Sequence, residues 1–153
     1  MTNEEFVRLV SDAERSLYRV AKSILRNDED CADAIQSAIL NAFDKLDTLR
    51  QKKYFTTWLT RILINECYQT LRSRREQVSY EDYMEGQESP QENGEVYEAV
   101  MELEEMYRMP VVLYYIEGYS VKEVASILEI SVSNVKVRLS RARNMLRDIL
   151  KGV

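Results

Sequence analysis

Residues 118–150, GYSVKEVASILEISVSNVKVRLSRARNMLRDIL, predict two helices separated by a tight turn. Ser120 and Glu123 have the three-residue spacing of a capping box, which marks the start of a short helix. The turn at residues 129–131 leads into a longer helix that we expect over residues 133–149. A short helix, a tight turn and a longer basic helix together make the arrangement of a helix-turn-helix.

The longer helix has an apolar side and a polar side when its residues are placed at 100° steps. The apolar side, which we expect to be buried, holds Val135, Leu139, Ala142, Leu146 and Ile149. The other side and its flanks hold mainly hydrogen-bonding groups and cations, with no acid: Ser133, Asn134, Lys136, Val137, Ser140, Arg141 and Asn144. Such a face can enter a DNA major groove, where amides and guanidiniums bond base edges and phosphates. The alternative is an ordinary solvated face.

Apolar residues recur at helical spacing in the N-terminal half and predict three further helices. The first stripe holds Phe6, Leu9, Val10, Ala13, Leu17, Val20, Ala21, Ile24 and Leu25. The second holds Ile35, Ala38, Ile39, Ala42, Phe43 and Leu46, and the third includes Trp58, Leu59, Ile62 and Leu63. A polar loop at residues 47–54 separates the last two. We also expect residues 95–117 to be helical in two pieces divided at Pro110, with Gly118 as the C-cap.

Residues 77–94 carry five acids, no base, and three of the six glycines and prolines in the chain. Such a segment cannot bury enough apolar surface to become ordered, so we interpret it as a flexible linker. The chain is then two small helical domains, residues 1–76 and 95–153. The fold class is all-α.

Composition excludes several kinds of chemistry. The 153 residues include no histidine and only two cysteines, Cys31 and Cys67, which disfavours zinc and haem sites and removes the usual general base. Neither a paired-carboxylate motif nor a phosphate-binding loop is present, so we expect no enzyme, no metal and no cofactor. The isolated thiols, the absence of a signal peptide and the short apolar runs suit a soluble cytoplasmic protein that does not insert into a membrane.

The net charge is −5, but its distribution is uneven. Residues 131–151 hold six bases against one acid. A basic stripe on an acidic chain indicates a local contact with an anionic partner, and argues against a general polyanion binder.

The segment 118–150 closely resembles the fourth conserved region of bacterial RNA polymerase sigma factors, above all the extracytoplasmic-function group. Residues 102–120, ELEEMYRMPVVLYYIEGYS, resemble the first part of the same domain. Residues 32–43, ADAIQSAILNAF, are similar to the second-region helix that docks on the polymerase clamp. Residues 55–76, FTTWLTRILINECYQTLRSRRE, look like the promoter-melting segment. Since the matches lie in both halves, their joint occurrence is far more specific than either alone.

The resemblance implies a transcription initiation factor that directs core RNA polymerase to promoters through their −10 and −35 elements. The implied partners are the clamp and flap of core polymerase, promoter DNA and an anti-sigma factor, with no small-molecule substrate. The linker at residues 77–94 would act as a tether whose sequence does not matter. Alternatively, as the resemblance implies, it would pass through the RNA exit path of the polymerase. A stand-alone helix-turn-helix repressor or activator is the main rival, and would show a symmetric half-site footprint without polymerase.

The resemblance also implies a role for individual residues. The polymerase-binding residues would be Asp33, Gln36, Leu40 and Asn41, with an ordinary surface patch as the alternative. The −10 element would be met by Thr48, Leu49, Arg50, Lys53, Tyr54, Trp58, Asn65, Arg72, Arg74 and Arg75. Within that set, Trp58 also suits the core, Asn65 also suits a structural bond, and the three arginines also suit a basic helix end. The −35 element would be met by Ser133, Asn134, Lys136, Val137, Arg138, Ser140, Arg141 and Arg143. Arg138 lies nearer the apolar side, which suits a backbone phosphate.

Three positions depart from the family's pattern. Ser37 follows Gln36 where an acid is usual, which weakens the expected clamp contact. Glu129 occupies the turn where glycine is common, and residues 103–104 are Leu-Glu where Leu-Pro is usual. We expect these last two to change local geometry and to leave the fold intact.

Overall fold

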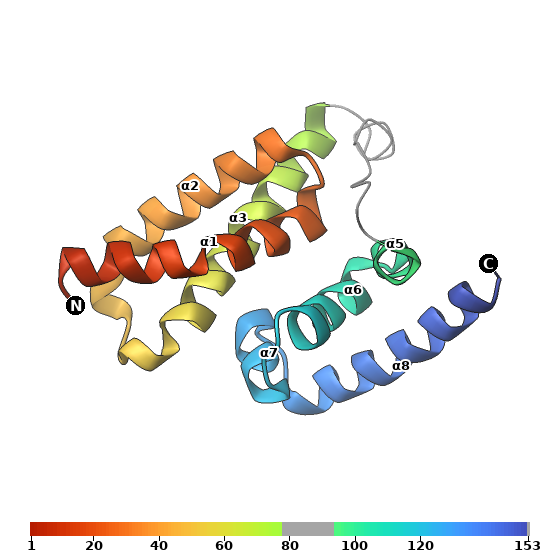
Figure 1. The fold of residues 1–153 in the computed structure, drawn as a ribbon. Coiled ribbons are helices and arrows are strands. Elements are labelled where there is room, and N and C mark those ends of the chain that lie inside the picture. Colours follow the sequence, from red (N-terminus) through yellow and green to blue (C-terminus); the bar gives the residue numbers. More distant parts are fainter. Residues whose placement is uncertain (78–93, 153) are drawn as a thin grey trace. The chain divides into compact units, whose positions relative to one another are not determined.

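The computed structural model describes residues 1–77 and 94–152, with side chains up to residue 74 in the first range (Figure 1). The chain forms two compact units, Met1–Ser89 and Pro90–Val153. No strand is found in the two described ranges, so the predicted all-α class is confirmed there. Among the same residues no helix is both long and apolar enough to cross a membrane. The predicted linker falls almost wholly on residues 78–93, outside the described residues.

The N-terminal unit is built from α1 (Asn3–Leu25), α2 (Asp28–Asp44) and α3 (Phe55–Gln77), each packed against the other two (Figure 1). The short 3-10 turns η1 (Leu46–Thr48) and η2 (Lys52–Tyr54) connect α2 to α3. The Thr2 hydroxyl caps the start of α1 by accepting from the backbone N–H of Glu5 at 3.1 Å. The predicted stripe of α1 is buried along its length except for Leu9, which is half-buried.

The prediction for α2 was partly wrong, because its buried row is made of small residues. The fully buried apolar positions are Cys31, Ala34, Ala38 and Ala42. The larger residues Ile35 and Ile39 are half-buried at the sides of this row, Phe43 is exposed, and Leu46 falls in η1. Small side chains let α2 approach both α1 and α3 closely, so the bulkier residues are displaced to the edges of the contact.

Both thiols are buried in this unit. Burial raises the pKa of Cys31 to about 12 and also raises the pKa of Cys67. Both cysteines therefore remain protonated at neutral pH and act as small core residues, because the thiolate is the reactive form.

The C-terminal unit contains α5 (Glu95–Glu102), α6 (Glu105–Val111), the π-helical turn η3 (Val112–Ile116), α7 (Val121–Leu128) and α8 (Val132–Lys151). α8 packs against α5, α6 and α7 (Figure 1). The predicted ends of the two helices of the helix-turn-helix are confirmed to within two residues. The capping box is also confirmed, since Ser120 accepts from the Glu123 N–H at 3.1 Å and Glu123 accepts from the Ser120 N–H at 2.9 Å.

The predicted division at Pro110 was wrong, because the helix breaks at Leu103 and Glu104, both in extended backbone with ψ of 147° and 151°. Arg108 is buried and donates from Nη1 to the carbonyl of Leu103 at 2.8 Å. This bond satisfies a carbonyl at the end of α5 that would otherwise lie buried without a partner. Pro110 lies inside α6, and the wider π-helical turn follows it. Glu104 thus has an extended backbone at the position where the sigma-factor pattern usually has proline.

Gly118 and Glu129 both have left-handed backbone, with φ of 80° and 57°. Gly118 ends the helical run before α7, as predicted. Glu129 ends α7, and its N–H donates to the carbonyl of Ala125. Glu129 therefore adopts the left-handed conformation that glycine commonly takes at the end of a helix, where a non-glycine residue is strained.

Glu129→Gly is expected to raise the free energy of unfolding by about 0.5–1 kcal/mol, because relief of the strain exceeds the added entropy of the unfolded chain. Chemical denaturation followed by circular dichroism measures the change. Ser126→Gly, also exposed and inside α7, is the matched control and should cost about 0.5–1 kcal/mol. A loss of stability in Glu129→Gly as large as in the control would contradict the strain.

Candidate nucleic-acid interface

The two sides of α8 lie as the sequence predicts. Val135, Leu139 and Ala142 are buried under α6 and α7, and Leu146 and Ile149 are half-buried nearer the C-terminus. The predicted reading residues are exposed: Ser133, Asn134, Lys136, Val137, Ser140, Arg141 and Arg143. Arg138 is half-buried, in keeping with its place beside the apolar side. The structure thus brings all eight predicted −35 residues onto one helix, seven of them on its open surface.

The N-terminus of α8 is set by a cap. The Ser131 hydroxyl accepts from the backbone N–H of Asn134 at 3.1 Å. The side chain of Asn134 is exposed at the first turn. Val137 lies one turn further and is 45% exposed, which leaves an apolar group on the polar face. An amide and a short apolar group at this spacing can meet a base edge and a thymine methyl in a major groove.

The cations of α8 have few partners within the protein. Arg143 donates from Nη1 to the Tyr115 hydroxyl at 3.0 Å, and Arg147 donates to the Asn144 side chain at 3.3 Å. Both bonds go to neutral groups, so the charges remain uncompensated. Arg141 and Lys136 make no ion pair with any residue in the described part of the chain. A row of uncompensated cations favours binding to a polyanion.

The predicted polymerase-binding residues of α2 divide into two kinds. Asp33, Gln36 and Leu40 are exposed, Leu40 to 67%. Asn41 is half-buried, and its amide donates to the carboxylate of Glu66 on α3. The structure therefore groups three of the four on one open surface and gives Asn41 a bond inside the protein.

The loop of residues 48–54 is held in place at several points. The Thr48 hydroxyl donates to the carbonyl of Lys45 at 2.6 Å, and the Lys53 ammonium lies over the Tyr54 ring, 5.1 Å from its centre. Lys52 makes an ion pair with Glu5 at the start of α1, and this bond lowers the pKa of the Glu5 carboxyl. Leu49 is half-buried, whereas Arg50, Lys53 and Tyr54 are exposed. The loop thus exposes polar and aromatic side chains, and its backbone is held by these contacts.

Trp58 is half-buried, so only part of its side chain belongs to the core and part remains accessible. Its ring lies 5.9 Å from Phe55, which contacts Phe6 at 5.8 Å, and Phe6 contacts Phe43 at 5.4 Å. This aromatic row crosses from α2 through α1 to α3. Trp58 thus lies at the end of this row, next to Phe55.

The other predicted −10 residues follow along α3. Asn65 and Arg72 are exposed, and the Asn65 amide makes no hydrogen bond to the described residues. Arg74 pairs with the buried Asp30 carboxylate at 2.8 Å, an ion pair between α3 and the start of α2. The side chain of Arg75 lies outside the described residues. Asn65 and Arg72 are therefore the open groups of this set, and Arg74 has a structural partner.

The partners of several charged and polar side chains of this unit and of α8 are not predictable from the sequence. Tyr115, Glu66, Asp30 and Lys52 each bond a side chain that lies between 25 and 47 positions away along the chain. The two partners belong to different elements, which only the tertiary fold brings together. No local spacing indicates such pairs. Among the described residues, no group of three or more Cys, Asp or Glu side chains is arranged to hold a metal ion.

Comparison with known proteins matches both units. The model of sigma-70 region 2 matches residues 9–77, and that of sigma-70 region 4 matches residues 93–146. SigM of Mycobacterium tuberculosis, an extracytoplasmic-function RNA polymerase sigma factor, is 32% identical over 150 residues, which span 95% of this chain and 76% of SigM. SigV of Bacillus subtilis, an RNA polymerase sigma factor, is 26% identical over 151 residues, which span 95% of this chain and 91% of SigV.

A solved structure is also similar. The sigma factor RpoE of Bartonella quintana, in complex with the anti-sigma factor NepR, has a TM-score of 0.81 and 26% sequence identity. The similarity covers 97% of this chain and 98% of that one.

Proposed function

The chain belongs to the extracytoplasmic-function group of the sigma-70 family of RNA polymerase sigma factors, and from this premise we propose how its two units act at a promoter. It is a transcription initiation factor that binds core RNA polymerase and directs it to promoters. The chain itself performs no bond-forming step in this scheme, because RNA synthesis belongs to the polymerase. It works in the cytoplasm, where polymerase and DNA are found.

The C-terminal unit binds the −35 element through α8. The observation that carries this proposal is the exposed, acid-free face around Val137, which lies opposite a buried row and bears uncompensated cations. Asn134 and Arg141 meet base edges in the major groove, and the cations on the flanks meet phosphates. α6 and α7 support α8 from the buried side and hold the face in one orientation.

The N-terminal unit binds the −10 element as single strand. The loop of residues 48–54 and the exposed Asn65 amide supply hydrogen-bonding groups for the edge of an unstacked base. The accessible part of Trp58 offers a surface for stacking. Arg72 meets phosphate, and Arg74 supports α3 through Asp30.

The exposed surface of Asp33, Gln36 and Leu40 on α2 docks on the polymerase clamp, and the C-terminal unit meets the flap. Residues 77–94 join the two units. Linkage makes the second DNA contact intramolecular, so two weak contacts add up to one selective interaction. The net charge of −5 disfavours binding to bulk DNA without polymerase. An anti-sigma factor is a further partner, supported by the complex of the similar RpoE with NepR.

Run-off transcription tests the proposed function. Core polymerase is assayed on a pool of promoter fragments with and without the chain, and we expect specific transcripts only in its presence. The Arg141→Ala chain should lose these transcripts while it still co-purifies with polymerase. Failure of the wild-type chain to bind core polymerase, together with a symmetric footprint on DNA alone, would instead indicate a stand-alone repressor or activator.

Asn65→Ala is expected to impair promoter opening by about 1–3 kcal/mol and to leave formation of the closed complex almost unchanged, because the amide meets a base only after strand separation. Permanganate reactivity of unpaired thymines measures opening, and promoter binding in the cold measures the closed complex. Gln69→Ala, exposed one turn further along α3, is the matched control and should open promoters normally. A lowered melting temperature with normal opening would show that Asn65 has a structural role.

A further inference from the structure

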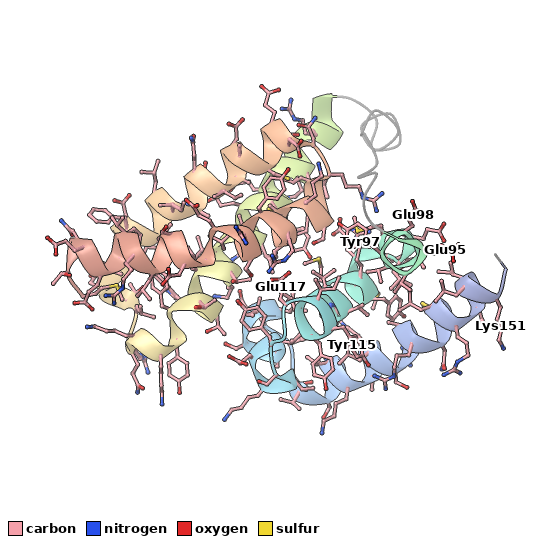
Figure 2. All side chains as sticks on the ribbon, in the orientation of Figure 1. Glu95, Tyr97, Glu98, Tyr115, Glu117 and Lys151 are labelled. Carbon is pink, nitrogen blue, oxygen red and sulfur yellow. The ribbon has the colours of Figure 1, made fainter. Side chains whose placement is uncertain are left out.

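The Tyr115 side chain links η3 to the middle of α8. Its hydroxyl oxygen accepts a hydrogen bond from Nη1 of Arg143 at 3.0 Å, although the side chain remains 52% exposed. The ring of Tyr114 meets the Tyr115 ring edge to face, with centres 4.9 Å apart and planes at 84°, which limits the freedom of the Tyr115 ring. Figure 2 shows that Tyr115 and Glu117 leave the chain on different sides.

Arg143 belongs to a row of exposed residues on one flank of α8. The row is Lys136, Ser140, Arg143 and Arg147, at spacings of four, three and four residues that keep them on one side of a helix. The opposite flank of the polar face carries Asn134 and Arg141. A helix in a major groove lies between two phosphate backbones, so each flank of its polar face meets one backbone.

We propose that the Tyr115 hydroxyl and the Arg143 guanidinium form a two-donor site for a backbone phosphate of the promoter duplex, with Tyr115 as the residue that positions Arg143. The inference rests on the proposed function, because it requires that α8 enters the −35 element. It adds to the interface a contact from outside the helix-turn-helix, since Tyr115 belongs to η3.

The chemistry of the two groups fits one phosphate. A guanidinium has five N–H donors in a planar fork, and the bond to Tyr115 uses one of them. The phenol accepts that bond through a lone pair, which leaves its own O–H free to donate in a direction that the Arg143 bond fixes. Two donors held at a defined spacing suit the oxygens of one phosphodiester, and prior ordering of the arginine reduces the entropy lost on binding.

The flank as a whole also fits a backbone. At about 1.5 Å of rise per residue, the cations of Lys136, Arg143 and Arg147 lie about 10 Å and 6 Å apart along the helix axis. Long cationic side chains spread over this length can meet more than one phosphate of a single strand. Because phosphates are the same for every base, this flank supplies affinity and register without reading sequence.

Tyr115→Phe tests the inference, because it removes only the hydroxyl. The full chain is assembled with core polymerase, and its affinity for promoter duplex is measured over a range of salt concentrations. We expect Tyr115→Phe to weaken binding about 3–10-fold, and equally on promoters with altered −35 sequences. Arg143→Ala should weaken binding more and reduce the salt slope by about 1. Because the two groups act together, the double variant should lose less than the product of the two single losses.

Tyr114→Phe, the half-buried neighbour, is the control and should bind as the wild-type chain does. Wild-type affinity of Tyr115→Phe, independent losses in the double variant, or a loss that depends on the −35 sequence would each overturn the inference. Thermal melts of the same variants exclude loss of fold as the cause. Arg141→Ala distinguishes failure of this inference from failure of the proposed function. If Arg141→Ala weakens promoter binding and Tyr115→Phe does not, only the phosphate site is rejected. If both variants bind normally, the proposed role of α8 is rejected.

Discussion

Phe55→Ala is expected to lower the free energy of unfolding of the N-terminal unit by about 3–5 kcal/mol, the largest effect we predict for a single substitution. Phe55 is 1% exposed and is the first residue of α3. Its ring lies between Phe6 of α1 and Trp58, at 5.8 Å and 5.9 Å. Truncation to alanine therefore leaves a cavity where α1 and α3 meet and removes support from the loop of residues 48–54.

Chemical denaturation followed by circular dichroism measures this loss. Tyr54→Ala is the matched control, because Tyr54 precedes Phe55 and is 51% exposed, so its loss should change stability by no more than about 0.5 kcal/mol. Stability of Phe55→Ala within about 1 kcal/mol of the wild-type chain would show that the aromatic row does not hold the unit together.

Leu139→Ala is expected to lower the free energy of unfolding of the C-terminal unit by about 2–5 kcal/mol. Leu139 is 3% exposed and lies on the buried side of α8 between Val135 and Ala142. Removing three carbon atoms there leaves a cavity beneath α8 without touching its exposed face. Chemical denaturation of the full chain measures this loss. At low temperature, where the variant is folded, its complex with polymerase should bind promoter DNA as the wild-type complex does.

Arg141→Ala is the counterpart on the other side of the same helix. Arg141 is exposed and makes no ion pair with the described residues, so its loss should leave stability within about 0.5 kcal/mol of the wild-type chain. It should cost about 1–3 kcal/mol of promoter affinity in the complex with polymerase. Early unfolding of Arg141→Ala together with normal folding and lost DNA binding of Leu139→Ala would mean that the helix face is assigned backwards.

The agreement between sequence and structure is best where short-range rules act. Helix periodicity located α1 and both sides of α8, and the pair Ser120 and Glu123 located the start of α7. The agreement is poorer for α2. Periodicity predicts burial from hydrophobicity, but the narrow space between α2 and its two neighbouring helices admits only small side chains, so Ala34, Ala38 and Ala42 are buried there. The break before α6 was missed for a related reason, since buried Arg108 bonds Leu103 only once the helices have packed.

The all-α class, the helix-turn-helix with its exposed polar face, and the family can be predicted from the residues alone, because each rests on spacings within a short stretch of chain or on motifs in both halves. Which site residues are free to act depends on the packing of the helices. It pairs Asn41 with Glu66, Arg74 with Asp30 and Arg143 with Tyr115, and it leaves Asn65 and Arg141 open. A side-chain hydrogen bond or ion pair depends on distances of a few ångströms between elements far apart in the chain, and no local sequence pattern specifies such distances.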